Sequence, residues 1–153
     1  MGQLTPDVLE LANAHGELRR HAIPHLMKQG SHESAARILK QLIEVSPERV
    51  EDLRLAASLF GRLRRRDEAL DYARRAIELD PNELATQTSY LMLLLQDGRV
   101  EEAGAHAMTL DDRVEEHPKL AAMVLLSLTR SERFEEAAQI AATFDESLIT
   151  DET

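Results

Sequence analysis

The sequence predicts an all-α protein built from repeated pairs of antiparallel helices. Hydrophobic residues make up 43% of the 153 residues, which is enough for one domain with a core. Aromatic residues make up only 3%, so the core must consist of the abundant Ala and Leu side chains, which favour closely packed helices over a sheet. In addition, one short pattern recurs along the chain at a fixed spacing, as in repeat architectures.

Four segments carry this pattern, and they start 34 residues apart at Gly30, Arg64, Gly98 and Glu132. The same slot of each segment holds an alanine, at Ala35, Ala69, Ala103 and Ala137. Pro47 and Pro81 close the first two copies, where a residue without a backbone N–H cannot continue a helix. The period therefore divides the chain into similar units, each long enough for two helices.

The first helix is expected at 6–28, because Thr5-Pro6-Asp7 combines a capping residue with a proline in the first turn. The next unit gives helices at 32–45 and 48–62, and in the latter Leu53, Ala56 and Phe60 follow helical spacing. The same reasoning predicts further helices at 66–79, 82–97, 99–109, 118–130 and 132–146.

At this point the chain resembles the tetratricopeptide repeat (TPR) family, whose unit has 34 residues. The second copy carries the pattern most fully, with Leu53, Ala56, Ala57, Phe60, Ala69, Ala76 and Pro81. The resemblance implies a right-handed superhelical solenoid of antiparallel helix pairs, in a single domain. Its expected parts are an N-terminal capping helix or extension at 1–15, three repeats at 16–49, 50–83 and 84–117, and a degenerate repeat at 118–150.

The resemblance also implies which residues bind a ligand, since the first helices of successive units line a concave groove. The groove positions mapped in this way are Arg20, Met27, Arg54, Ser58, Thr88, Met92, Leu95 and Leu126. The same mapping also includes Glu17, Pro24, Glu51, Gly61, Ala85, Lys119, Ala122 and Thr129. The arginines suit a carboxylate or backbone carbonyls, whereas the Met and Leu side chains offer adaptable apolar contacts. A partly apolar, partly acidic segment would fit.

Composition argues against several classes of function. The chain has no Cys, and no nucleophile with a base or phosphate-binding Gly loop is found, so we expect neither an enzyme nor a cofactor. The net charge is −10, with 5 Lys or Arg against 15 Asp or Glu in residues 82–153, which disfavours nucleic acid. No apolar run could span a bilayer and the start does not read as an export signal, so we expect a cytoplasmic protein without membrane insertion. The preference for Arg over Lys suggests a bacterial source.

Two charged clusters have a structural explanation as well as a functional one. His21 and His25 have a spacing that can chelate a metal on a helix, but Pro24 lies between them and no carboxylate set accompanies them, so we expect no metal site. The run Arg62, Arg64, Arg65 and Arg66 could dock an acidic partner, although such runs are more often solvated.

The sequence thus predicts a non-catalytic protein–protein interaction module, an adaptor, assembly factor or chaperone that holds a peptide or helix in its groove. The alternative is a self-associating or structural subunit of a larger complex, such as a component like the secretion-system chaperones. Homo-oligomers would form through the last repeat, because no further helix pair follows it in the sequence to shield it.

Overall fold

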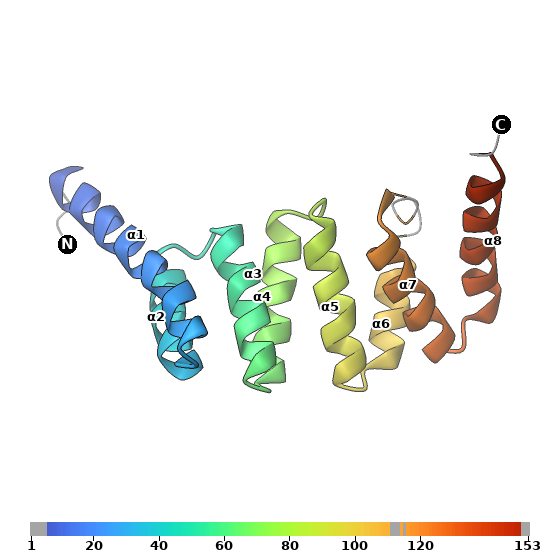
Figure 1. Ribbon diagram of the computed structural model, residues 1–153, viewed down its shortest axis with the longest axis horizontal. Helices are drawn as coiled ribbons and strands as arrows, with labels where there is room; N and C mark the ends of the chain where they lie inside the picture. Colours follow the sequence, from blue (N-terminus) through green and yellow to red (C-terminus); the bar gives the residue numbers. More distant parts are fainter. Residues whose placement is uncertain (1–5, 111–113, 115, 151–153) are drawn as a thin grey trace. The chain divides into compact units, whose positions relative to one another are not determined.

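The computed structural model describes residues 6–110, 114 and 116–150, and the side chains of 14–110, 114 and 116–144. Over this part the chain is all-helical, with no strand (Figure 1). The helices are α1 (Pro6–Lys28), α2 (His32–Val45), α3 (Val50–Arg62), α4 (Arg66–Leu79), α5 (Leu84–Gln96), α6 (Val100–Ala107), α7 (Pro118–Arg130) and α8 (Phe134–Thr150). They fall into two compact units, residues 1–72 and 73–153, and the boundary lies within α4.

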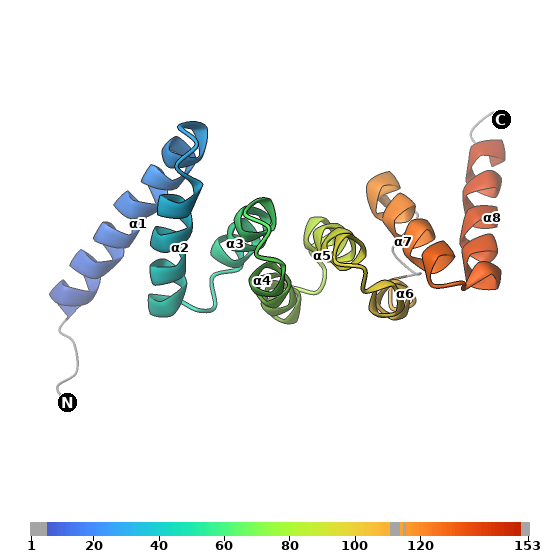
Figure 2. The same cartoon turned by 90° about the horizontal axis from the view of Figure 1, so that it is seen from below.

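In the first unit, α2 lies beside α1 and also packs against α3 (Figures 1 and 2). Ile23, Leu39, Leu53 and Phe60 are almost completely buried, so aliphatic side chains and one ring fill the space between these helices. The Arg20 guanidinium crosses to α3 and donates hydrogen bonds of 3.0 and 2.8 Å to the Asp52 carboxylate, which is 4% exposed. This bidentate pair raises the pKa of Arg20, chiefly through the hydrogen bond itself.

In the second unit, α5 packs against α6 and α7, and α7 packs against α6 and α8 (Figures 1 and 2). Leu91, Leu94, Leu120, Val124 and Leu128 are completely buried and form the core of this unit. Because α5 and α7 contact each other directly, two helices that begin successive predicted repeats lie next to one another.

The predicted alanine slot is a core position in each repeat. Ala35, Ala69 and Ala103 have no exposed surface, and Ala137 is 9% exposed. Each of these alanines also donates its backbone N–H to the carbonyl four residues earlier, at Ser31, Arg65, Arg99 and Arg133. The 34-residue period therefore repeats both the burial and the backbone geometry of the second helices.

The turn between the two helices of a repeat has the same backbone conformation in all four repeats. Gly30, Arg64, Gly98 and Glu132 all have positive φ, at 76°, 59°, 74° and 60°. The following N–H bonds back to the helix in the same way each time, as in Ser31 to Leu26 O at 2.9 Å and Arg133 to Leu128 O at 2.8 Å. This is the left-handed termination in which glycine is usual, and two of the four copies adopt it without glycine.

The helix positions confirm the sequence prediction closely. Four helices have the expected bounds, and the others differ by a few residues at their ends. α3 and α5 begin two residues later than predicted. Residues 46–49 form the turn before α3, and residues 80–83 form the turn before α5. The proposed N-terminal extension is continuous with the first helix of repeat one, within α1, while Thr5 lies outside the described residues.

Candidate functional site

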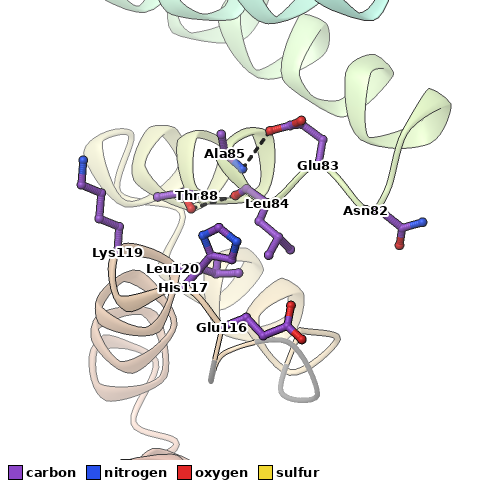
Figure 3. A pocket seen from close by; sticks show the side chains of 9 residues that line it. All are labelled: Asn82, Glu83, Leu84, Ala85, Thr88, Glu116, His117, Lys119 and Leu120. Atoms are coloured by element: carbon purple, nitrogen blue, oxygen red, sulfur yellow. Dashed lines mark hydrogen bonds between the residues drawn. The ribbon is translucent and has the colours of Figure 1, made fainter.

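An open cleft of about 650 Å³ lies between the beginnings of α5 and α7 (Figure 3). The residues that line it are Asn82, Glu83, Leu84, Ala85, Thr88, Glu116, His117, Lys119 and Leu120. Figure 3 shows Leu84 and Thr88 of α5 facing His117 and Leu120 at the start of α7. The cleft therefore combines an aliphatic floor with polar side chains around it.

The α5 side of the cleft is fixed by hydrogen bonds. The Glu83 carboxylate caps α5 by accepting a bond of 3.3 Å from the N–H of Ala85. Thr88 Oγ1 donates to the Leu84 carbonyl at 2.8 Å, so its methyl group and not its hydroxyl hydrogen is available to a ligand. Both bonds are drawn in Figure 3. Glu83 and Thr88 therefore each use a side-chain oxygen in a hydrogen bond to the backbone at the start of α5.

A second set of bonds holds the chain before α5 in place. Gln87 Nε2 donates to the Pro81 carbonyl at 2.9 Å, which leaves Gln87 Oε1 as the acceptor for His106 Nε2 at 2.6 Å. The His106 ring also meets Tyr90 edge-on, with 4.8 Å between centroids. Burial lowers the pKa of His106, so it stays neutral in this network at pH 7. The turn that borders the cleft is thereby anchored to α5 and α6.

The α7 side supplies the free charges of the cleft. Glu116, His117 and Lys119 are exposed, and no hydrogen bond or ion pair joins their side chains to the described residues. An ammonium group, an imidazole and a carboxylate within one cleft can each pair with a polar ligand group. Because Lys119 begins a helix turn whose next exposed residues are Ala122 and Leu126, the surface changes from polar to apolar along α7.

The apolar part of this surface lies one to two turns further along both helices. Met92 of α5 is 43% exposed and Leu126 of α7 is 41% exposed, so both present apolar surface to solvent. Met92 is four residues after Thr88, and Leu126 is seven after Lys119, so each pair shares a helix face. We call the surface formed by Ala85, Thr88, Met92, Lys119, Ala122 and Leu126 the α5–α7 face.

The residues predicted from the sequence for a groove are distributed over both units. Thr88, Met92 and Leu126 belong to the α5–α7 face, together with the mapped Ala85, Lys119 and Ala122. Leu95 is only 8% exposed and contributes to the core. Sequence reasoning missed Leu84, Glu116 and His117, since they lie at the helix starts, outside the mapped positions. The helix-starting signals themselves, Pro118 above all, could have pointed to them.

The other four predicted residues belong to the first unit. Arg54 and Ser58 are exposed on α3, and Met27 is half-buried near the end of α1. Arg20 is already paired with Asp52 and also donates to Glu17 at 3.0 Å, so its guanidinium is engaged within the protein. The carboxylate that the sequence assigned to a ligand of Arg20 is therefore an internal one.

The Arg-rich turn of the first unit is partly neutralised. Arg65 donates to Glu68 at 2.7 Å and lies over the Phe60 ring, 4.7 Å from its centroid. The hydrogen bond to Glu68 is the main reason that the pKa of Arg65 is raised. Arg62 and Arg64 are exposed beside it. Among the described residues, no three His, Asp or Glu side chains gather as a metal site requires, and none of the described helices is long and apolar enough to cross a bilayer.

Comparison with known proteins identifies the repeat and the fold. Residues 55–83 match the family model described as "Tetratricopeptide repeat", within the repeat predicted at 50–83. Comparison with curated protein sequences gave no match.

The fold is similar to that of several solved structures at low sequence identity. A MamA protein has 16% identity and a TM-score of 0.73, over 95% of this chain and 78% of its own. MamA from Desulfovibrio magneticus RS-1 has 20% identity and a TM-score of 0.70, over 86% and 76%. YrrB, described as a TPR protein with an unusual peptide-binding site, has 18% identity and a TM-score of 0.68, over 86% and 68%. Residues 55–83 are thus a tetratricopeptide repeat, and the chain has the fold of tetratricopeptide-repeat proteins.

Proposed function

We propose that this chain is a non-catalytic interaction module that binds a peptide or helix of a partner protein on the α5–α7 face. The observation that carries the proposal is the cleft of about 650 Å³ between two first helices, together with Met92 and Leu126, which are exposed one to two turns further along the same helices. Concave, largely apolar surfaces with a few convergent polar groups are the usual ligand sites of proteins. The description of YrrB, which has a similar fold, names a peptide-binding site, and this supports the proposal.

The chemistry of the face defines the ligand. Met92 and Leu126 would accept one or two apolar side chains, because a thioether and a branched aliphatic group adapt to different shapes. Lys119 and His117 would pair with a carboxylate or carbonyl at the cleft end, and Glu116 with a donor. An amphipathic segment with apolar residues at helical spacing and an acidic residue one to two turns away meets both requirements.

The role in the cell follows from this mode of binding. A rigid face that holds one exposed apolar segment suits an adaptor, an assembly factor or a chaperone that protects a subunit before it is assembled. A chaperone of the secretion-system type is the most specific form of this proposal. In each case the protein acts by providing a surface, and the function that we propose is a non-catalytic one.

The test is a peptide selection followed by quantitative binding. A displayed library of random peptides would be selected on the full chain, and the affinity of the enriched peptides measured by fluorescence anisotropy. Met92→Glu and Leu126→Glu should each weaken binding at least tenfold, about 1.4 kcal/mol, because a charge would have to be desolvated against an apolar side chain. Lys119→Glu should weaken acidic peptides more than neutral ones.

Met108→Glu is the matched control, because Met108 is 36% exposed at the end of α6, outside this face. Equal helicity of all variants by circular dichroism is required before affinities are compared. Peptides that bind wild type, Met92→Glu and Met108→Glu alike would show that the α5–α7 face is not the site. Enriched peptides that contain neither apolar nor acidic residues would contradict the proposed ligand chemistry.

A further inference from the structure

The outer side of α8 exposes positions that are buried in every earlier repeat. Ala138 and Ala141 are exposed on α8. The residues at the same two repeat positions are buried on α2, α4 and α6, and they are Ala36 and Leu39, Leu70 and Ala73, and Gly104 and Ala107. In the second unit no other helix lies on the side of α8 away from α7 (Figures 1 and 2).

The two units show what normally covers these positions. In the first unit α2 packs against α3, and in the second α6 packs against α7, so the covering element is the first helix of the next repeat. The approach is very close at the position of Gly104, where an added Cβ would lie 2.1 Å from Ser131 Oγ at the end of α7. Ala138 occupies that position on α8, and Ala36, which holds the same position on α2, is buried, so an alanine there is compatible with a covering helix.

The first helix of the chain shows the opposite half of the same interface. Leu18 of α1 is 69% exposed, whereas Asp52, Thr86 and Leu120 at the same repeat position are at most 4% exposed. His25 is exposed as well, whereas Leu59, Leu93 and Ser127 at its repeat position are buried. α1 thus presents to solvent the positions that α3 and α7 bury within their units.

We propose that the chain associates head to tail, with α1 of one copy packing on α8 of the next copy. The new interface would continue the repeat, since α1 has the position that α3 has on α2 and α7 has on α6. Leu18 would take the place of Leu120, and Ala138 the place of Gly104. Such a contact joins two different surfaces, so it does not close on itself in a pair and allows chains of more than two copies.

The distribution of charge favours this arrangement over a symmetric contact between two α8 helices. Residues 134–144 hold Glu135 and Glu136 and no basic residue, within a half of the chain that carries 15 acidic and 5 basic residues. The whole of α1 holds three basic residues, Arg19, Arg20 and Lys28, against three acidic ones, Asp7, Glu10 and Glu17. Two α8 surfaces of like charge would repel each other, whereas α1, whose formal charges balance, would not repel α8.

The test is the mass of the full chain in solution, measured by sedimentation equilibrium over micromolar to millimolar concentrations. Wild type should show an average mass that rises with concentration past that of two chains. Ala141→Glu and Leu18→Glu should each weaken association at least about tenfold, because each buries a charge in the apolar contact. Both residues are exposed within one copy, so neither change disturbs its folding.

Ala142→Glu is the matched control on the same helix. Ala142 is also exposed, but its repeat position is exposed on α2, on α4 and directly after α6 as well, at Lys40, Arg74 and Met108. It should associate like wild type. Equal loss of association in Ala141→Glu and Ala142→Glu would mean that the net charge and not this face controls assembly.

Mixing the two interface variants distinguishes the directions of assembly. Leu18→Glu keeps its α8 surface and Ala141→Glu keeps its α1 surface, so each alone should remain a single chain and their mixture should form a pair of one copy each. A dimer of Leu18→Glu alone would demonstrate a symmetric contact. Wild type that stays a single chain throughout, or a mixture that does not pair, would overturn the proposal.

Discussion

Exchanging glycine and alanine at the four left-handed turn positions measures the energy of that backbone conformation directly. An alanine Cβ at Gly30 or Gly98 would meet no atom within 4 Å, so the only native-state cost is the positive φ of 76° or 74°. A left-handed residue with a side chain costs about 1–2 kcal/mol. Alanine also lowers the conformational entropy of the unfolded chain, which offsets about 0.4–1 kcal/mol of this cost. Gly30→Ala and Gly98→Ala should therefore destabilise the protein by about 1 kcal/mol.

The same difference should appear where the natural residue is not glycine. Arg64 and Glu132 have φ of 59° and 60°, and both are exposed. Replacing either by Gly and, separately, by Ala removes the same natural side chain in both variants, so their difference isolates the backbone. The Gly variant should be more stable than the Ala variant by about 1 kcal/mol at each position.

The assay is urea unfolding followed by circular dichroism, with thermal unfolding as a check, where 1 kcal/mol corresponds to about 2–4 °C in a domain of this size. Ser58, exposed within α3, supplies the control. There the order must reverse, since Ala is better than Gly by about 1 kcal/mol inside a helix. Alanine variants as stable as the glycine variants at positions 30, 64, 98 and 132 would refute the equivalence of the four turns.

Three further changes test the packing of each unit. Asp52→Ala should cost about 3 kcal/mol in urea unfolding, because it leaves the half-buried Arg20 guanidinium without its carboxylate; a loss below about 0.5 kcal/mol would show that water replaces it fully. Burial lowers the pKa of His106, so this histidine binds a proton more readily in the unfolded protein than in the folded one. Wild type should therefore lose stability as the pH falls below the ordinary histidine pKa of about 6.5, and His106→Gln should lose less. Parallel profiles of stability against pH for the two proteins would contradict this. Gly104→Ala should destabilise the second unit by about 2 kcal/mol, because the new methyl group would clash with Ser131. Adding Ser131→Gly should restore most of the lost stability. Purely additive effects in the double variant would rule out the contact.

The helices could be predicted from the sequence because residues within each repeat mark where its helices begin and end. Three signals recur together: the alanine at one slot, the proline after the second helix and the residue at each turn. A helix boundary that is weakly marked in one repeat can therefore be placed by comparison with another. The exceptions are local too. Glu83 ends a turn and caps α5 with its side chain, so the helix begins at Leu84, a boundary that helical spacing alone places earlier.

The candidate site could be predicted only in part. The repeat pattern assigns residues to groove positions, but it does not reveal which other side chains surround them. Of the mapped residues, Thr88 lines the cleft, and Met92 and Leu126 are exposed on the same two helices, while a binding role for all three stays a prediction. The pattern also selected Arg20, but the carboxylate of Asp52, 32 residues later, takes up its hydrogen bonds. No spacing rule reveals that pair, since it depends on which two side chains face each other across α1 and α3.

The ion pairs of the first unit have a consequence for how the protein folds. Arg20 with Asp52, Arg49 with Glu17 and Arg65 with Glu33 each join residues 32 positions apart, which is close to the length of one repeat. The chain therefore closes loops of one uniform, short length, and the entropy of loop closure is lost in small equal steps. Contacts of this kind give a low contact order, so rapid folding is expected, and it can begin at any repeat.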